Sequence, residues 1–183
     1  MKRAVILFAE GYETVEALLV VDLLRRGGVE VTMASITEDE FVRSSHGVNV
    51  EMDAVLGEVD ILDYDAIILP GGMPGTTNLK EDENVRKAVQ EAYDDGRYVA
   101  AICAAPTILA DMGLLKGKRA TCYPDMESEI EDAYLTGAPV ATDENIITSQ
   151  GVGTAIDFAL KLIEVLISEE KAVEIADSIV YQR

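Results

Sequence analysis

The chain has 183 residues, of which 49% are hydrophobic and 27% charged, as expected for a single folded domain with a substantial core. Its 34 acidic and 15 basic residues give a net charge of −19, which argues against nucleic acid or an anionic membrane surface as a partner, since both bind clustered lysine and arginine. The apolar runs are too short to span a bilayer, and the N-terminal one ends at Glu10, so we expect no membrane helix and no signal peptide.

The first elements form a strand–helix–strand unit. Residues 3–9 are an apolar run typical of a buried strand. Thr14 can cap a helix over residues 15–26, which ends at two glycines, and residues 29–34 follow as a second strand. Connections of this length place the two strands parallel, so the start of the chain indicates a parallel sheet.

The alternation of strands and helices continues along the chain. Residues 41–43 and 48–50 flank a polar turn that contains Gly47, and this pattern predicts a β-hairpin. The other predicted elements are strands at residues 66–69, 98–102 and 118–123, a strand pair within 140–149, helices at 84–94 and 154–167, and a short helix with a tail over 170–183. Together they predict an α/β domain over residues 1–183, doubly wound around a mostly parallel central sheet.

Cys103 stands where the apolar strand 98–102 meets a helix that begins near Pro106. Small residues surround it, as a sharp strand-to-helix turn requires. The serine version of this arrangement is the nucleophile elbow G-x-S-x-G, and here alanine replaces both glycines. Backbone amides at a helix start favour a nearby anion and lower the pKa of a thiol. Taken alone, the segment leaves two interpretations equally open, a reactive nucleophile and a small buried core residue.

Glu16 heads an apolar stripe on the first predicted helix, because the residues three, four, seven and eight positions further on are all apolar. Either the carboxylate lies in the first helical turn, where the helix dipole favours it, or it is buried. Burial would raise its pKa, keep it protonated near neutrality and allow it to donate a hydrogen bond to a thiolate. Both interpretations remain open from the residues alone.

Glycines follow another strand at the edge of the sheet where sites form, the carboxyl ends of the parallel strands. Gly71 and Gly72 come directly after strand 66–69, and their backbone amides, with that of Ala104, could form an oxyanion hole. The alternative is a glycine-rich turn without a role. The segment 151–153 also holds two glycines, but it lacks a full phosphate-binding pattern, which indicates helix packing instead.

The chain has two cysteines and one histidine, which limits its chemistry. Two cysteines at this spacing form neither a disulfide framework nor a metal pair, and a reducing, cytoplasmic compartment is the default. A single histidine excludes a multi-histidine metal site, and we expect neither a metal nor another cofactor. We interpret His46 as an exposed turn residue rather than a general base, Cys122 as a core residue, and Tyr123, on the opposite face of its strand, as a site-lining residue.

Three segments carry a resemblance to a known family. They are AAICAAPT at residues 100–107, LPGG at residues 69–72 and TSQGVGT at residues 148–154. They resemble the ThiJ/PfpI superfamily and, within it, the branch of the parkinsonism-associated protein DJ-one and its bacterial relatives. The likeness covers essentially the whole chain. It implies a flavodoxin-like α/β sandwich that usually forms a homodimer.

The resemblance also implies roles for single residues. It makes Cys103 the reactive elbow cysteine, Glu16 the protonated glutamate bonded to it, and Gly72 and Ala104 the oxyanion donors. Two positions depart from the family pattern. Peptidases of the PfpI type carry a histidine directly after the cysteine, where this chain has Ala104, so we do not expect a peptidase. The human relative has a histidine at the position of Tyr123, so this chain keeps a Cys–Glu pair without a cysteine–histidine pair.

Two functions follow from the resemblance and remain open. The first is an enzyme in which Cys103 attacks the carbonyl of a small aldehyde such as methylglyoxal, or of a glycated adduct, while Glu16 moves protons. The second is a redox-sensing stress-response protein, or a chaperone, in which Cys103 is oxidised to a sulfinate that Glu16 and the backbone amides stabilise. The substrate class comes from the resemblance and not from the composition.

Overall fold

The centre of the structure is the apolar strand β1 (Arg3–Phe8), in which residues 4–8 are all buried. The computed structural model describes residues 1–182 of the chain. Strand β1 pairs in parallel with β2 (Glu30–Ser35) on one side and with β6 (Ala66–Leu69) on the other. Strands buried on both faces read as continuous apolar runs, which is why these segments are recognisable from the sequence.

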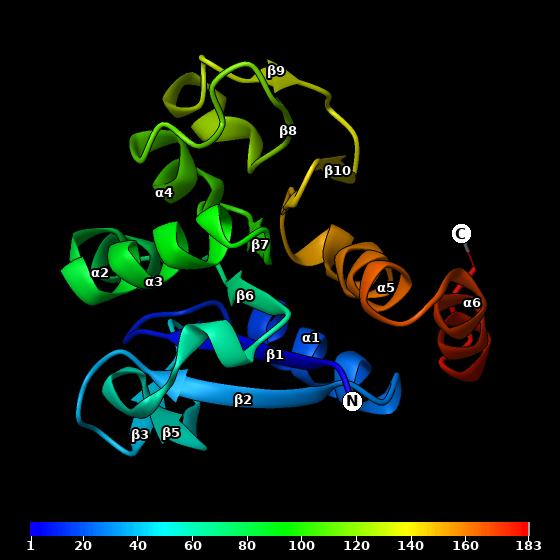
Figure 1. Ribbon diagram of the computed structural model, residues 1–183, viewed down its shortest axis with the longest axis horizontal. Coiled ribbons are helices and arrows are strands. Elements are labelled where there is room, and N and C mark those ends of the chain that lie inside the picture. The colour runs from blue at the N-terminus through cyan, green and yellow to red at the C-terminus, as the bar shows by residue number, and fades with distance from the viewer. Residues whose placement is uncertain (183) are drawn as a thin grey trace.

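The central sheet has seven strands and is parallel except at one edge (Figure 1). The other strands of this sheet are β5 (Ala54–Val55), β7 (Tyr98–Ile102), β10 (Val140–Asp143) and β11 (Ile146–Ser149). Their order is β10-β11-β7-β6-β1-β2-β5, and only β10 runs antiparallel to its neighbour. The predicted α/β fold with a mostly parallel central sheet is confirmed.

Helices cover both faces of this sheet and enclose two hydrophobic cores (Figure 1). Successive side chains of β1 alternate between them, so that Ile6 lies in one core and Leu7 in the other. The first core lies under α1 (Thr14–Arg26), α5 (Ala155–Leu166) and α6 (Glu169–Ser178). The second lies under α2 (Gly75–Glu81), α3 (Glu83–Asp94) and α4 (Pro106–Asp111).

Strands β6, β7 and β11 end at the same edge of the sheet. In the parallel register Leu69 lies opposite Ala101, and Ile102 lies opposite Ser149. The loops that follow these three strands therefore emerge beside one another, although they are far apart in the sequence. This is the edge at which the sequence predicted a site.

The predicted hairpin is confirmed as the antiparallel pair β3 (Phe41–Arg43) and β4 (Asn49–Glu51). The predicted strand over residues 118–123 is wrong in its length. Only β8 (Arg119–Ala120) forms, and it pairs with β9 (Tyr134–Leu135) in a separate small sheet. The strand stops because the following backbone amides bond elsewhere, that of Thr121 to the Thr148 hydroxyl and that of Tyr123 to the Cys103 carbonyl.

Two features at helix ends differ from the sequence expectation. Glu13, not Thr14, caps α1, because its carboxylate accepts a 2.6 Å hydrogen bond from the amide of Val15, while the Thr14 hydroxyl donates to Ser44. Helix α2 was not predicted, since its first residues, Gly-Thr-Thr-Asn, have low helix propensity. Burial of Leu79 in the second core outweighs that preference.

The C-terminal segment contains the predicted short helix, α6, which ends at Ser178. Position 183, part of the predicted tail, lies outside the described residues. Among residues 1–182, no helix combines the length and the apolar character that crossing a membrane requires.

Candidate active site

Cys103 occupies a sharp elbow between β7 and α4. Its φ of 65° lies in the left-handed region, which is strained for a residue other than glycine. The main chain is held on both sides, because the Cys103 amide donates a 2.9 Å hydrogen bond to the Ser149 carbonyl and the Cys103 carbonyl accepts one of 2.8 Å from the Tyr123 amide. The side chain is half-buried and its thiol is free. The elbow predicted from the sequence is therefore present in the backbone geometry.

Glu16 lies in the first turn of α1 and is also buried, with 1% of its surface exposed. Its Oε2 accepts a 3.0 Å hydrogen bond from the amide of Gly71. Gly71 in turn fits between Glu16 and Cys103, since a Cβ at residue 71 would lie 2.6 Å from Oε2 of Glu16 and 2.6 Å from Cβ of Cys103. The loop after β6 thus brings the carboxyl and the thiol together.

Burial raises the pKa of Glu16 from its ordinary value of 4.5 to about 7. The Cys103 thiol and the Gly71 amide act in the opposite direction, and the negative charge of Glu13 adds to the increase. The second oxygen, Oε1, is buried and has no well-formed hydrogen bond within the described part of the chain. Of the two interpretations of Glu16, the structure supports the buried carboxyl, which still lies in the first turn of the helix.

Burial, together with the charge and hydrogen bonding of Glu16, raises the pKa of the Cys103 thiol to about 12. The amides of Ala104 and Gly72 lower it, as expected for donors at a helix start, but they do not dominate. Helix α4 has only 6 residues, and the dipole of so short a helix is small. At neutral pH the thiol therefore keeps its proton, and the Glu16 carboxylate is the nearby group that can accept it.

The amides of Gly72 and Ala104 lie near the Cys103 thiol, and their hydrogen-bonding capacity lowers its pKa. Gly72 has a φ of +91°, and a Cβ there would overlap the backbone of Tyr12 and Glu13. Only glycine can therefore bring this amide to the site. An oxygen atom on a carbon bonded to the sulfur would lie beside two N–H donors, an arrangement suited to a developing oxyanion.

The remaining sequence-predicted side chains are placed as follows. Cys122 is buried in the core with 1% exposure, and Tyr123 is 44% exposed at the site. His46 is an exposed turn residue, with Nδ1 3.8 Å from Oε1 of Glu13. Within residues 1–182, histidine, cysteine, aspartate and glutamate side chains do not gather in any group of three that could hold a metal ion.

Gly151 was assigned to helix packing from the sequence, and the structure corrects this. A Cβ at this position would lie 3.9 Å from Sγ of Cys103, so Gly151 faces the candidate site. A signal was available, because Gly151 follows β11 by two residues and β11 is the neighbour of the cysteine strand. Glu13, which raises the pKa of Glu16, was also missed, because its position depends on the cap of α1.

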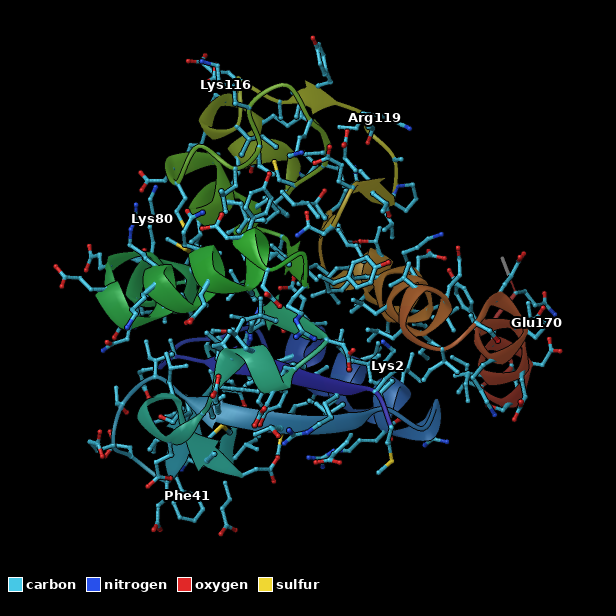
Figure 2. The ribbon with its side chains drawn as sticks, viewed as in Figure 1. Lys2, Phe41, Lys80, Lys116, Arg119 and Glu170 are labelled. Carbon is cyan, nitrogen blue, oxygen red and sulfur yellow. The ribbon has the colours of Figure 1, made fainter. Side chains whose placement is uncertain are left out.

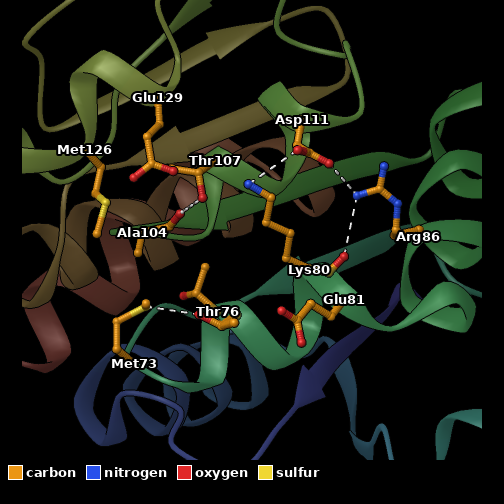
Figure 3. Close-up of a pocket in the computed structure, with 11 residues that line it drawn as sticks. Met73, Thr76, Lys80, Glu81, Arg86, Ala104, Thr107, Asp111, Met126 and Glu129 are labelled. Atoms are coloured by element: carbon orange, nitrogen blue, oxygen red, sulfur yellow. Dashed lines mark hydrogen bonds and ion pairs between the residues drawn. The ribbon is translucent and has the colours of Figure 1, made fainter.

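A cavity of about 440 Å³ opens beside Ala104 (Figure 3). On one side Lys80 and Arg86 both reach Asp111, at 3.4 and 2.7 Å. Thr76 also lines the cavity, and its buried hydroxyl has no hydrogen-bond partner among the described residues. The cavity borders Ala104, one of the two residues whose amides lie at the sulfur, whereas Gly72, Cys103 and Glu16 are not among the residues that line it.

Comparison of the sequence with known proteins finds a family that matches most of the chain. A family model described as the DJ-1/PfpI family covers residues 2–165. Protein DJ-1 homolog B of Arabidopsis thaliana is 41% identical over 181 residues, which are 98% of this chain but 41% of that protein. A Caenorhabditis elegans protein named glutathione-independent glyoxalase DJR-1.2 is 35% identical over 174 residues, 93% of this chain and 91% of that protein.

A solved structure supports the same relationship. Protein dj-1beta of Drosophila melanogaster is 38% identical over 177 residues, 96% of this chain and 95% of that protein. Its crystal structure superposes with a TM-score of 0.95 and 37% identity, covering 100% of this chain and 99% of that one. The chain thus spans less than half of the Arabidopsis protein and nearly the whole of the Drosophila protein.

Proposed function

This chain belongs to the DJ-1/PfpI family, and we propose that it converts small 2-oxoaldehydes such as methylglyoxal into hydroxy acids through Cys103 and Glu16. One relative is named a glutathione-independent glyoxalase. The observation that carries the proposal is the packing of Cys103 and Glu16 against Gly71, beside the amides of Gly72 and Ala104. A carboxyl group with a pKa of about 7 is well matched to moving protons at neutral pH.

In the first step the Cys103 sulfur forms a bond to the aldehyde carbon, and the carbonyl π electrons move to the oxygen. The thiol proton passes to the Glu16 carboxylate and from there to the new oxyanion, which yields a hemithioacetal. Until it is protonated, the oxyanion accepts hydrogen bonds from the amides of Gly72 and Ala104. Glu16 is then a carboxylate again.

In the second step Glu16 removes the hydrogen of the former aldehyde carbon as a proton, and the proton returns to the neighbouring carbon through an enediol. The first carbon is oxidised to a thioester while the neighbouring ketone is reduced to an alcohol. The reaction therefore needs no external oxidant or reductant. Water then cleaves the thioester and releases lactate and the Cys103 thiol, so methylglyoxal and water give lactate.

The test is lactate formation by the purified protein incubated with methylglyoxal. We expect turnover by the wild type and by the Cys122→Ala control, which alters the other cysteine in the core. We expect no turnover by Cys103→Ser. Absence of lactate with the wild-type protein, or undiminished turnover by Cys103→Ser, would contradict the proposal. A glycated amine in place of methylglyoxal tests the related adduct substrates.

A second candidate function is redox sensing by Cys103. The amides of Gly72 and Ala104 lie at the sulfur, where they can donate hydrogen bonds to sulfinate oxygens, and protonated Glu16 adds a third donor. Mass spectrometry after mild peroxide treatment tests this function. A gain of two oxygen atoms on Cys103 in a protein that makes no lactate would favour the sensor over the enzyme.

We propose that the protein is cytoplasmic, because the reducing conditions of the cytoplasm keep Cys103 as a thiol. We also propose that it forms a homodimer. Val15, Phe41 and Val48 are exposed around the start of α1 and the β3–β4 hairpin, which adjoin through Thr14 and Ser44. Phe41 projects away from the molecule (Figure 2). Exposed apolar surface of this kind favours self-association. Light scattering should give twice the mass of one chain, and a monomeric mass would contradict the homodimer.

A further inference from the structure

Three groups of the candidate active site lie around the position that a side chain on Gly151 would occupy. A Cβ on Gly151 would lie 3.9 Å from Sγ of Cys103, 3.8 Å from Oε1 of Glu16 and 3.7 Å from Cδ2 of Tyr123. These are ordinary van der Waals distances, so the methyl group of an alanine fits there and fills the space. A side chain at this position would therefore compete directly with anything bonded to the sulfur.

The main chain does not itself require glycine at residue 151. Its φ of 162° is extended backbone that any residue adopts. The turn is held by Thr154, whose hydroxyl accepts a 3.1 Å hydrogen bond from the Gly151 amide, donates one of 3.0 Å to the Gly151 carbonyl and lies 2.7 Å from Oγ of Ser149. The relevant property of glycine at residue 151 is therefore that it has no side chain, so that the space beside Cys103 stays free.

One side of this space is formed by a buried carboxyl oxygen that makes no well-formed hydrogen bond among the described residues. Oε1 of Glu16 belongs to a residue with 1% exposure and makes no well-formed hydrogen bond within residues 1–182, although the Cys103 thiol interacts with this carboxyl group. A buried polar atom of this kind is costly unless a bound molecule or water meets it. Because Oε1 lies 3.8 Å from the Cβ position of residue 151, a hydroxyl or carbonyl group bound in this space would meet it.

We propose that Gly151 determines the substrate specificity of the site. The space that it leaves holds the substituent beside the reacting carbonyl of a small 2-oxoaldehyde, with Glu16 at the adjacent oxygen and the Tyr123 ring as the apolar wall. This inference rests on the proposed function. A methyl group on residue 151 takes the place of the methyl group of methylglyoxal, whereas glyoxal, with hydrogen there, still fits.

The experiment compares Gly151→Ala with Gly153→Ala, a matched control in the same turn whose Cβ position has no atom within 4 Å. The value of kcat/KM is measured for glyoxal and for methylglyoxal. We expect the methylglyoxal-to-glyoxal ratio to fall at least about tenfold in Gly151→Ala, the lower end for discrimination by one carbon, and to stay unchanged in Gly153→Ala. An unchanged ratio in folded Gly151→Ala overturns the inference.

Two further measurements cover the other outcomes. If Gly151→Ala does not fold, Tyr123→Ala, which opens the opposite wall, must raise kcat/KM for phenylglyoxal relative to methylglyoxal, and an unchanged ratio overturns the inference. If the wild type makes no hydroxy acid from either dicarbonyl, the proposed function fails. The space is then tested by mass spectrometry of Cys103, where Gly151→Ala must slow alkylation by iodoacetamide more than oxidation by hydrogen peroxide. Equal slowing overturns the inference.

Discussion

The amide of Gly71 donates a 3.0 Å hydrogen bond to Oε2 of Glu16, and it does so from a position that has no room for a side chain. A Cβ at residue 71 would come within 2.6 Å of that same oxygen and of Cβ of Cys103. The end of β6 therefore fixes the separation between the carboxyl and the thiol. Any larger residue there must displace one of the two.

We expect Gly71→Ala to impair both stability and activity. Overpacking of a buried contact costs about 1–3 kcal/mol, and a displacement of about 1 Å between reacting groups can cost roughly 100-fold in rate. Urea unfolding and lactate formation measure the two effects. Gly57→Ala is the control, because its Cβ position has no atom within 4 Å, and equal behaviour of the two variants would contradict the packing described above.

The raised pKa of Glu16 predicts how stability depends on pH. Between 4.5 and about 7 the folded state holds a proton on Glu16 that the unfolded state has released, so this group stabilises the fold fully below pH 4.5 and less as pH rises through about 7. The full difference corresponds to about 3 kcal/mol. Glu16→Gln removes this dependence, since the amide does not titrate.

The measurement is the free energy of unfolding of wild type and Glu16→Gln at pH 4 and at pH 8, in about equal ionic strength. The advantage of the wild type over the variant should shrink by up to about 3 kcal/mol at the higher pH. Glu10→Gln, which removes an exposed carboxyl near the same sheet edge, should show no such change. A wild-type advantage that grows with pH would show that Glu16 is not a carboxyl with a raised pKa.

The pH profile of activity should reflect the same group. Glu16 accepts protons only as a carboxylate, so kcat/KM should rise with pH around a midpoint of about 7. Glu16→Gln should lose this limb together with roughly 100- to 10,000-fold in rate. Glu13→Gln should move the midpoint to lower pH, because the charge of Glu13 raises the pKa of Glu16. If the midpoint of the pH profile is the same in the wild type and in both variants, the titrating group is not Glu16.

His46→Ala should retain kcat/KM within about twofold, as expected for an exposed side chain outside the reacting groups. The ring is 76% exposed and meets Glu13 rather than the sulfur. Steady-state assays with methylglyoxal provide the check. A loss of activity on the scale expected for a general base, roughly 100-fold or more, would mean that an imidazole takes part after all.

The cysteine elbow and the central strands could be predicted because their signals are local. Residues 98–102 form an unbroken apolar run before Cys103, and small residues follow at once. The burial of Glu16 was one of two alternatives, since an apolar stripe says which face of a helix is buried but not how deep its first turn lies. Deciding between them required the position of Gly71, a residue far away in the sequence.

The features that were missed depend on tertiary contacts. Gly151 resembles a packing glycine in the sequence, and only the pairing of β7 with β11 brings the loop that contains it to the Cys103 side chain. Glu13 rather than Thr14 caps α1, because the Thr14 hydroxyl donates its hydrogen bond to Ser44 and the Val15 amide donates to the Glu13 carboxylate. Helix α2 exists through the burial of Leu79, against the preference of its own first turn.

The main chain of Cys103 is tied to Ser149 on one side and to Tyr123 on the other. Both partners are synthesised after the cysteine, so a ribosome must have completed most of the chain before the elbow can close. Contacts between such distant positions form late in folding, because their loop entropy must be overcome first. A nascent, truncated or partly unfolded chain therefore carries Cys103 as an ordinary thiol. Under the proposed function, lactate formation through Cys103 therefore requires that β7, β11 and the segment that contains Tyr123 have assembled.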